Sequence, residues 1–173
     1  PFVTNLDDTT LVSLNSSIRN TLFFNRSNPK FGLDYTYQDV GGKALLTSGF
    51  DSRGLKEHEI RIRWNINRKF TLISFQRLAE KSNTSDYTSG RDYNLDIWSV
   101  KPKFSYQPNT SFRISITNET SVKQNSQELG GETAEILDLG TEVRFNTATK
   151  GSVTGTFNYI QINYDGVVNS ALG

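Results

Sequence analysis

The chain has 173 residues, enough for one domain with a hydrophobic core, and its 19 basic and 18 acidic residues leave a formal net charge of only +1. This even balance argues against a nucleic-acid-binding surface, which shows as a clustered excess of lysine and arginine. The chain contains no cysteine, which excludes disulfides and thiolate metal sites. No apolar run approaches the ~20 residues of a transmembrane helix, whereas a transmembrane β-strand needs only about 9–11 residues of alternating character.

Apolar and polar residues alternate with a period of two along most of the chain, the pattern of β-strands with one apolar face. With turn residues as punctuation, the pattern predicts about eight strands, and helical spacing is nowhere as clear. The predicted strands lie near 16–26, 30–39, 56–67, 69–80, 92–106, 110–124, 133–147 and 151–164. The expected fold class is all-β, an antiparallel up-and-down meander that forms a closed β-barrel or a segment of a larger barrel.

Three segments fit this pattern less simply. Residues 43–50 form either a short extra strand or an ordered part of a loop. In 92–106 and 151–164 the apolar residues change parity part-way along, at Trp98 and at Ile160. Either a β-bulge shifts the faces there, or both faces of these strands are partly buried.

The predicted connections alternate along the chain between short and long. The short connections are 26–29, 67–69, 107–110 and 148–151, and the long, polar ones are roughly 40–55, 81–91 and 125–132. Because alternate connections of a meander lie at the same end, we expect tight turns at one end and longer loops at the other. That asymmetry is typical of outer-membrane barrels.

Residues 20–34 (NTLFFNRSNPKFGLD), 48–54 (SGFDSRG) and 169–173 (NSALG) carry a resemblance. They resemble the C-terminal region of large, poorly characterised outer-membrane or cell-surface proteins of Bacteroidota. Very large barrels of that phylum's protein-export and gliding machinery are similar in strand texture. The resemblance implies that further strands follow in such proteins. We therefore expect residues 1–173 to be a single β domain that is a fragment of a longer chain.

The alternation defines an apolar face without saying what that face contacts. The residues expected on it are Ile60, Ile62, Trp64, Ile66, Phe112, Ile114, Ile116, Leu137, Leu139, Val143 and Phe145. In a soluble sandwich or barrel these residues form the core. In a membrane barrel they face lipid, and the candidate lumen charges are Arg61, Arg63, Glu142 and Arg144. Whether Trp64 points outward or inward separates the two alternatives.

No recognisable catalytic, cofactor or metal motif is present. His58 lies between Glu57 and Glu59 and is interpreted as a solvated strand residue, because no further ligands at metal-binding spacing are evident. The polar loop at 83–92 lacks the acidic spacing of an EF-hand and is interpreted as an exposed loop. The enzymatic alternative is a carboxylate pair for glycoside hydrolysis, drawn from Asp34, Asp51, Asp86, Asp92 and Asp96. A basic cluster spans two adjacent strands and comprises Arg61, Arg63, Arg68, Lys69 and Arg77.

The sequence thus predicts a non-enzymatic outer-membrane β-barrel, or barrel segment, with a structural, anchoring or pore-wall role in a Gram-negative envelope. The expected location is the outer membrane or cell surface. The expected partners are membrane lipid and the remainder of a larger polypeptide or envelope complex, with no nucleic acid and no cofactor or metal. The alternative is a soluble bacterial surface β-sandwich or barrel module that binds a glycan or protein partner in a cleft lined by Tyr87, Trp98 or Tyr106.

Overall fold

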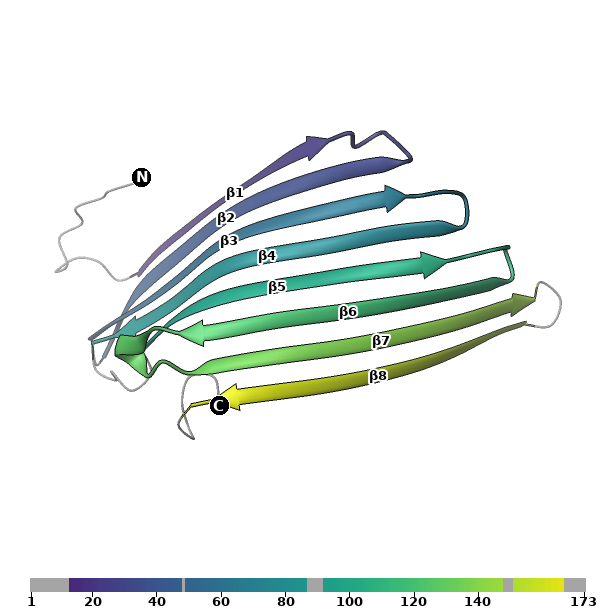
Figure 1. Ribbon diagram of the computed structural model, residues 1–173. Coiled ribbons are helices and arrows are strands. Elements are labelled where there is room, and N and C mark those ends of the chain that lie inside the picture. Colours follow the sequence, from purple (N-terminus) through teal and green to yellow (C-terminus); the bar gives the residue numbers. More distant parts are fainter. Residues whose placement is uncertain (1–12, 48, 87–91, 148–150, 167–173) are drawn as a thin grey trace.

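The computed structural model describes residues 13–47, 49–86, 92–147 and 151–166, which form one eight-stranded antiparallel sheet (Figure 1). The strands are β1 (Ser13–Phe24), β2 (Phe31–Leu46), β3 (Gly49–Asn65), β4 (Phe70–Ser85), β5 (Tyr93–Tyr106), β6 (Phe112–Asn125), β7 (Thr133–Thr147) and β8 (Gly151–Asp165). Each strand pairs with the next one along the chain, so that β1 and β8 are the edges of an open sheet. The predicted fold class, an all-β up-and-down meander, is confirmed, and the open sheet is consistent with a barrel segment.

Helical structure is almost absent from the described ranges. A single 3-10 turn, η2 (Gln127–Leu129), lies between β6 and β7. The described residues include no helix of the length and apolar character needed to cross a membrane.

Each of the seven ladders keeps one register from its first pair of residues to its last, although the β5–β6 ladder is interrupted at Lys101 and Pro102. No residue is inserted, so the bulge considered for β5 and β8 is wrong. In β5, Leu95 and Ile97 point to one face, and Trp98 and Val100 point to the other. The change of parity in the sequence therefore reflects apolar residues on both faces.

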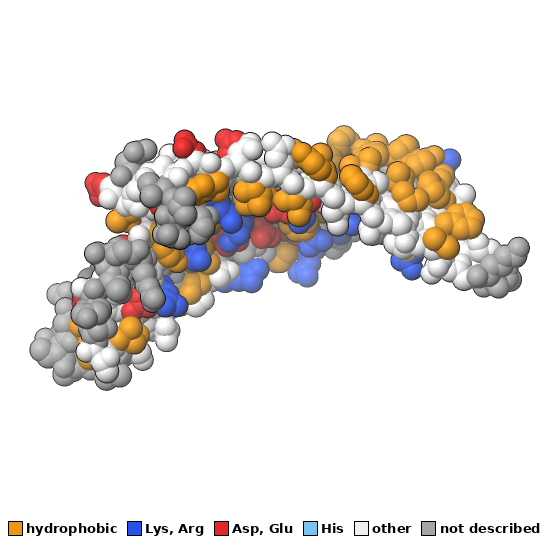
Figure 2. All heavy atoms as spheres, turned by 90° about the horizontal axis from the view of Figure 1, so that it is seen from below, with side chains coloured by type: hydrophobic (Ala, Val, Ile, Leu, Met, Phe, Trp, Pro, Cys, Tyr) orange, Lys and Arg blue, Asp and Glu red, His pale blue; other side chains and the backbone are white. Residues whose placement is uncertain are grey.

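Because paired residues point to the same side, the constant register gives the sheet the same two faces across all eight strands. We call the face that holds Ile62 and Trp64 the apolar face, and the face that holds Arg61 and Arg63 the charged face. Within the strands, the side chains with the lowest exposure all lie on the charged face: Ala79, Asn83, Leu95, Ser105, Ser115, Ser121, Asn125 and Ala134. The sheet is an arch, and its inner surface carries much of the visible lysine and arginine (Figure 2). Side chains on this concave side are therefore more shielded from solvent than those on the outer side.

The first half of the chain departs from the sequence-based boundaries. β2 continues to Leu46 and β3 begins at Gly49, so the long connection at 40–55 and the extra strand at 43–50 are both wrong. These residues are the two paired halves of one hairpin, with Val40 beside Leu55. Polar residues and glycines occupy both faces there, so the period-two signal disappears although the backbone ladder continues. β4 likewise continues to Ser85, so the long loop predicted at 81–91 is wrong over its first five residues. The connections after β4 and β6 span residues 86–92 and 126–132, and only these two keep part of the expected asymmetry.

Asn125 is the most deeply buried large side chain, and it organises the connection between β6 and β7. Its Nδ2 donates to the Leu129 carbonyl at 2.9 Å and to Glu132 Oε2 at 2.7 Å. Its Oδ1 accepts the backbone N–H of Asn94 at 3.0 Å, which ties the connection to β5, and that of Ser126 at 3.1 Å. One side chain therefore satisfies four polar groups at the end of the sheet.

Asn125→Ala is expected to lower the free energy of unfolding by about 1–3 kcal/mol, because buried backbone groups lose their partners. Urea unfolding of the folded protein in detergent micelles, followed by tryptophan fluorescence, measures this change. Asn146→Ala, at an exposed strand position, is the control and is expected to stay within about 0.5 kcal/mol of the parent. Equal losses in the two variants would contradict the assigned role of Asn125.

Candidate functional site

The residues predicted for the apolar face lie on one face, with one exception. Ile66 lies one residue beyond the end of β3, in the connection to β4. None of the set is buried in a central core, and Trp64 is 46% exposed. The described residues contain no second layer that covers this face, since all eight strands belong to one sheet.

A belt without charge crosses the apolar face next to the short hairpin turns. On β5 the belt runs from Trp98 to Tyr106, about 26 Å at ~3.3 Å per residue. Its members are aliphatic, aromatic or neutral polar residues on all eight strands. The neutral polar members in its interior include Ser74, Gln76, Asn118, Thr120, Thr141 and Gln161. The apolar band of an outer-membrane barrel is about 25 Å tall, so the belt matches it in depth.

The belt runs obliquely to the strands, as the turns do. Paired positions lead from Leu22, two residues before the end of β1, through Ile60 to Gln161, ten residues after the start of β8. The turn end therefore shifts by about one residue per strand, which corresponds to a tilt of roughly 35° for strands ~4.8 Å apart. The belt is tilted in the same direction as the line of turns. On β7 it extends to Phe145, which lies four residues closer to the turn end than Thr141, the residue in the same cross-strand row as Trp64.

The charged face holds the four candidate lumen charges, but their surroundings differ. Arg63 Nη2 donates to the carbonyls of Arg26 and Asn28, both at 3.2 Å, and so ties β3 to the connection between β1 and β2. Arg61 instead lies over the ring of Phe75, with its guanidinium carbon 5.4 Å from the ring centre.

The other two lumen charges lie on β7. Glu142 lines a hollow of about 380 Å³ together with Lys101 and Lys103. Arg144 lies directly beside Arg113 of β6 at the turn end. Two cross-strand ion pairs stabilise this face, Arg77 with Glu57 at 2.8 Å and Lys101 with Glu119 at 2.6 Å.

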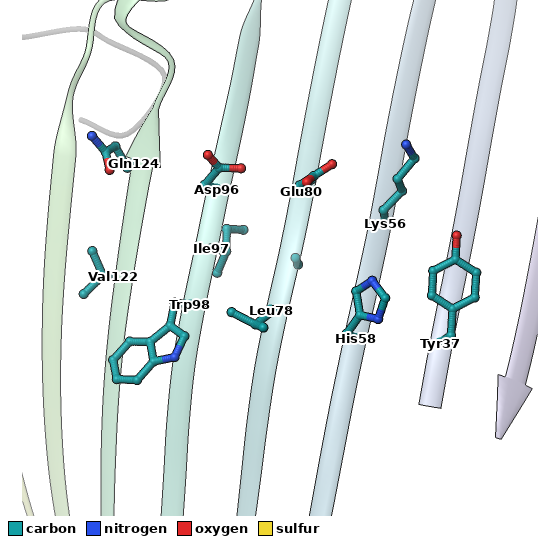
Figure 3. Close-up of a pocket in the computed structure, with 11 residues that line it drawn as sticks. Tyr37, Lys56, His58, Leu78, Glu80, Asp96, Ile97, Trp98, Val122 and Gln124 are labelled. Carbon is teal, nitrogen blue, oxygen red and sulfur yellow. The ribbon is translucent and has the colours of Figure 1, made fainter. Parts of the chain in front are cut away.

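Where the belt ends on the far side from the short turns, the apolar face is hollowed. We call this cavity of about 550 Å³ the rim pocket (Figure 3). Lys56, Glu80 and Asp96 form one row across β3, β4 and β5. The next row toward the belt is His58, Leu78 and Trp98. Along each of these strands the charged residue and the aromatic or apolar residue are therefore only two positions apart.

His58 takes part in a small aromatic cluster at the rim rather than standing alone. Its Nδ1 lies 2.7 Å from the Tyr35 hydroxyl, and its ring centre lies 5.0 Å from that of Tyr37. In the described part of the chain, no three His, Asp or Glu side chains gather in a way that holds a metal ion. The sequence alone does not reveal this cluster, because the three residues meet only through the pairing of β2 with β3.

The remaining candidates from the sequence are scattered. Asp34 lies on the charged face and Asp96 on the apolar face, so the considered carboxylates are not gathered at one place. Asp86 and Asp92 accept backbone N–H groups at strand ends, from Phe50 at 3.0 Å and Ser85 at 2.8 Å.

The cluster and cleft residues are scattered as well. Arg68 and Lys69 lie in the connection after β3, away from Arg77. Of the aromatics proposed for a cleft, Trp98 lines the rim pocket and Tyr106 stacks on Phe70 at the opposite end of the sheet. Tyr87 is outside the described residues.

Comparisons with protein-family models, curated proteins and solved structures found no match to this chain. The belt and the rim pocket are therefore interpreted from their own geometry.

The two arginines of β3 allow a matched test, because Arg63 binds two turn carbonyls whereas Arg61 is exposed. Arg63→Ala is expected to lower the free energy of unfolding by about 1.5–3 kcal/mol, because two turn carbonyls lose a charged donor. Arg61→Ala, which removes an exposed guanidinium, is expected to cost less than about 1 kcal/mol. Urea unfolding in micelles measures both values, and a larger loss for Arg61→Ala would contradict the assignment.

Proposed function

We propose that this chain is a non-enzymatic segment of an outer-membrane β-barrel, with a structural, anchoring or pore-wall role in a Gram-negative envelope. The observation that carries the proposal is the uncharged belt on a face that nothing in the described chain covers. A soluble domain rarely leaves so large an apolar surface open to water. Lipid provides the burial that a second protein layer would otherwise provide.

The shape of the belt supports lipid rather than a packed second sheet. Its borders follow the turn ends obliquely across the strands, as the faces of a flat slab do when tilted strands cross it. Aromatic residues lie at both borders, with Tyr106 and Trp64 toward the short turns and Trp98 toward the rim. Interfacial aromatic girdles are typical of membrane barrels.

In this proposal the charged face lines a polar lumen, and the ion pairs of Arg77 and Lys101 lie on that lining. The free edges of β1 and β8 present backbone groups that a bilayer cannot satisfy. Strands from the remainder of a larger polypeptide, or from an envelope complex, would pair with them. The resemblance to Bacteroidota surface proteins is in keeping with such an arrangement.

The second candidate is a soluble surface module that binds a glycan or protein, and the rim pocket with Trp98 is the observation that favours it. The two differ in a simple observable. Clean monomeric behaviour in buffer without detergent would support the soluble module and contradict the barrel.

Ile62→Arg tests the belt directly. Ile62 lies within the belt, and a charge near the middle of a bilayer is expected to cost about 2–4 kcal/mol of unfolding free energy. Asn158→Arg is the matched control, since Asn158 lies on the exposed charged face of β8 at a similar level, and little change is expected there. Both variants are compared by urea unfolding from lipid vesicles. Equal tolerance of both substitutions would overturn the proposal.

The two tryptophans report the two borders of the belt independently. Trp98→Phe leaves Trp64 as the single tryptophan, and Trp64→Phe leaves Trp98. In vesicles of phosphatidylcholine, lipids brominated on their acyl chains are expected to quench both, because both rings lie on the lipid-facing side. Fluorescence that brominated lipid leaves unchanged, while a water-soluble quencher reduces it, would contradict the assignment of this face.

A further inference from the structure

We infer that a hollow between three arginines on the charged face binds a phosphate dianion, either free or as a phosphate monoester. We call it the arginine hollow. It measures about 210 Å³ and is lined by Phe23, Arg26, Gly32, Asp34, Arg61 and Arg63. At ~30 Å³ per water molecule, it has room for a phosphate group with a few waters. The inference goes beyond the membrane proposal, because the hollow lies on the face opposite the belt.

Gly32 leaves the space in which the Arg63 guanidinium lies. The two residues are direct partners across β2 and β3, and Gly32 is buried. A Cβ atom at position 32 would lie 3.0 Å from Arg63 Nη2 and 3.4 Å from the Asn25 carbonyl oxygen. Without that atom, Arg63 reaches the two turn carbonyls that hold it in place. The guanidinium is therefore positioned before any ligand arrives, which reduces the entropic cost of binding.

The other two guanidiniums are positioned by aromatic rings. The guanidinium carbon of Arg26 lies 4.4 Å from the ring centre of Phe23, and that of Arg61 lies 5.4 Å from the ring centre of Phe75. Within the described ranges, neither guanidinium donates a hydrogen bond or forms an ion pair. Their N–H groups therefore remain available, and a planar guanidinium matches the spacing of two phosphate oxygens.

The protein does not neutralise the charge of the hollow. Asp34 is the one acid that lines it, and although it is the direct partner of Arg61, the two form no ion pair within the described structure. Three guanidiniums and one carboxylate leave two positive charges, which a phosphate dianion would balance. Arg63 Nε is buried without a hydrogen-bond partner, so the protein satisfies this guanidinium through Nη2 alone. A half-buried cation with incomplete partners favours an anion as the occupant.

The surroundings of the hollow reinforce its charge. Basic residues dominate the charged face within four residues of the short turns, where the described residues are Arg61, Arg63, Lys103, Arg113 and Arg144 against Asp34. The connections after β1 and β3 add Arg26, Lys30, Arg68 and Lys69 and no acid. A surface with one sign of charge raises the local concentration of ions of the opposite sign. In the barrel proposal, this end of the lumen therefore attracts anions toward the hollow.

The test uses the full chain, folded in micelles of an uncharged detergent, at an ionic strength held constant with sodium chloride. Equilibrium dialysis against radiolabelled inorganic phosphate measures binding. Saturable binding of a single phosphate is expected, and acetate at the same concentration is not expected to displace it. Absence of saturable binding, or equal displacement by acetate, would overturn the inference.

Competition identifies the source of the phosphate group. Displacement of the label by glycerol phosphate at lower concentrations than by unlabelled phosphate supports a phosphate monoester as the ligand. The reverse order supports the free anion. Failure of both compounds to displace the label would overturn the site.

Three single variants separate a built site from general attraction. Arg61→Gln is expected to weaken phosphate binding by roughly tenfold or more, because a charge-assisted hydrogen bond is lost. Arg61→Lys keeps the charge without the planar fork and is expected to recover only part of the affinity. Arg53→Gln removes a guanidinium from the same face of β3, near its other end, and is expected to bind phosphate as the parent does. Equal losses in Arg61→Gln and Arg53→Gln would overturn the inference.

Urea unfolding in the same micelles gives a second readout. Without phosphate, Arg61→Gln is expected to unfold close to the midpoint of the parent, so that its weaker binding does not reflect misfolding. Added phosphate is expected to raise the midpoint of the parent and of Arg53→Gln, because it binds the folded state. An equal rise in Arg61→Gln would overturn the site. These measurements use no lipid, so the arginine hollow and the membrane proposal fail separately.

Discussion

Backbone hydrogen bonds between neighbouring strands hold this molecule together, and the seven ladders run without an inserted residue. An unbroken register keeps each side chain on one face from β1 to β8, so no charged side chain lies on the apolar face within the belt. Each hairpin is offset from the last by about two residues, which tilts the strands by roughly 35°. The two faces, the belt and its slope all follow from that pairing.

A single layer of strands cannot bury its own apolar face. The only buried hydrophobic side chains among the described residues are Ala79, Leu95 and Ala134, and they lie on the inner side of the arch. The large hydrophobic residues of the belt stay exposed, with Trp64 at 46% and Phe145 at 52%. Ion pairs do not make up for this, since Lys101 and Glu119 are 49% and 34% exposed and such a pair contributes less than about 1 kcal/mol. Burial has to come from a surrounding phase or a partner, which is the physical basis of the membrane proposal.

The strands continue beyond the belt, and this extension creates the rim. Past Tyr37 and His58 both faces of β2 and β3 mix charged, polar and apolar residues, with glycine at Gly41, Gly42 and Gly54. The change from uncharged to charged side chains occurs at paired positions on four neighbouring strands, from Asp39 on β2 to Asp96 on β5. This boundary places charged groups next to the aromatic rings of Tyr37, His58 and Trp98.

The sequence by itself determined the strands, their direction of pairing and the identity of the two faces, because period-two alternation is a local property of each strand. It failed at 40–55, where polar residues, glycines and apolar residues are mixed on both faces and the alternation carries no signal. For β5 and β8 it left a bulge and apolar residues on both faces as alternatives, and the register excludes the bulge. Only the tertiary structure decided that no second layer in the described part of the chain covers Trp64, that the belt slopes with the turns, and that Lys56, Glu80 and Asp96 share a row. Those features depend on the offset between strands that are far apart in the chain, and no single strand encodes that offset.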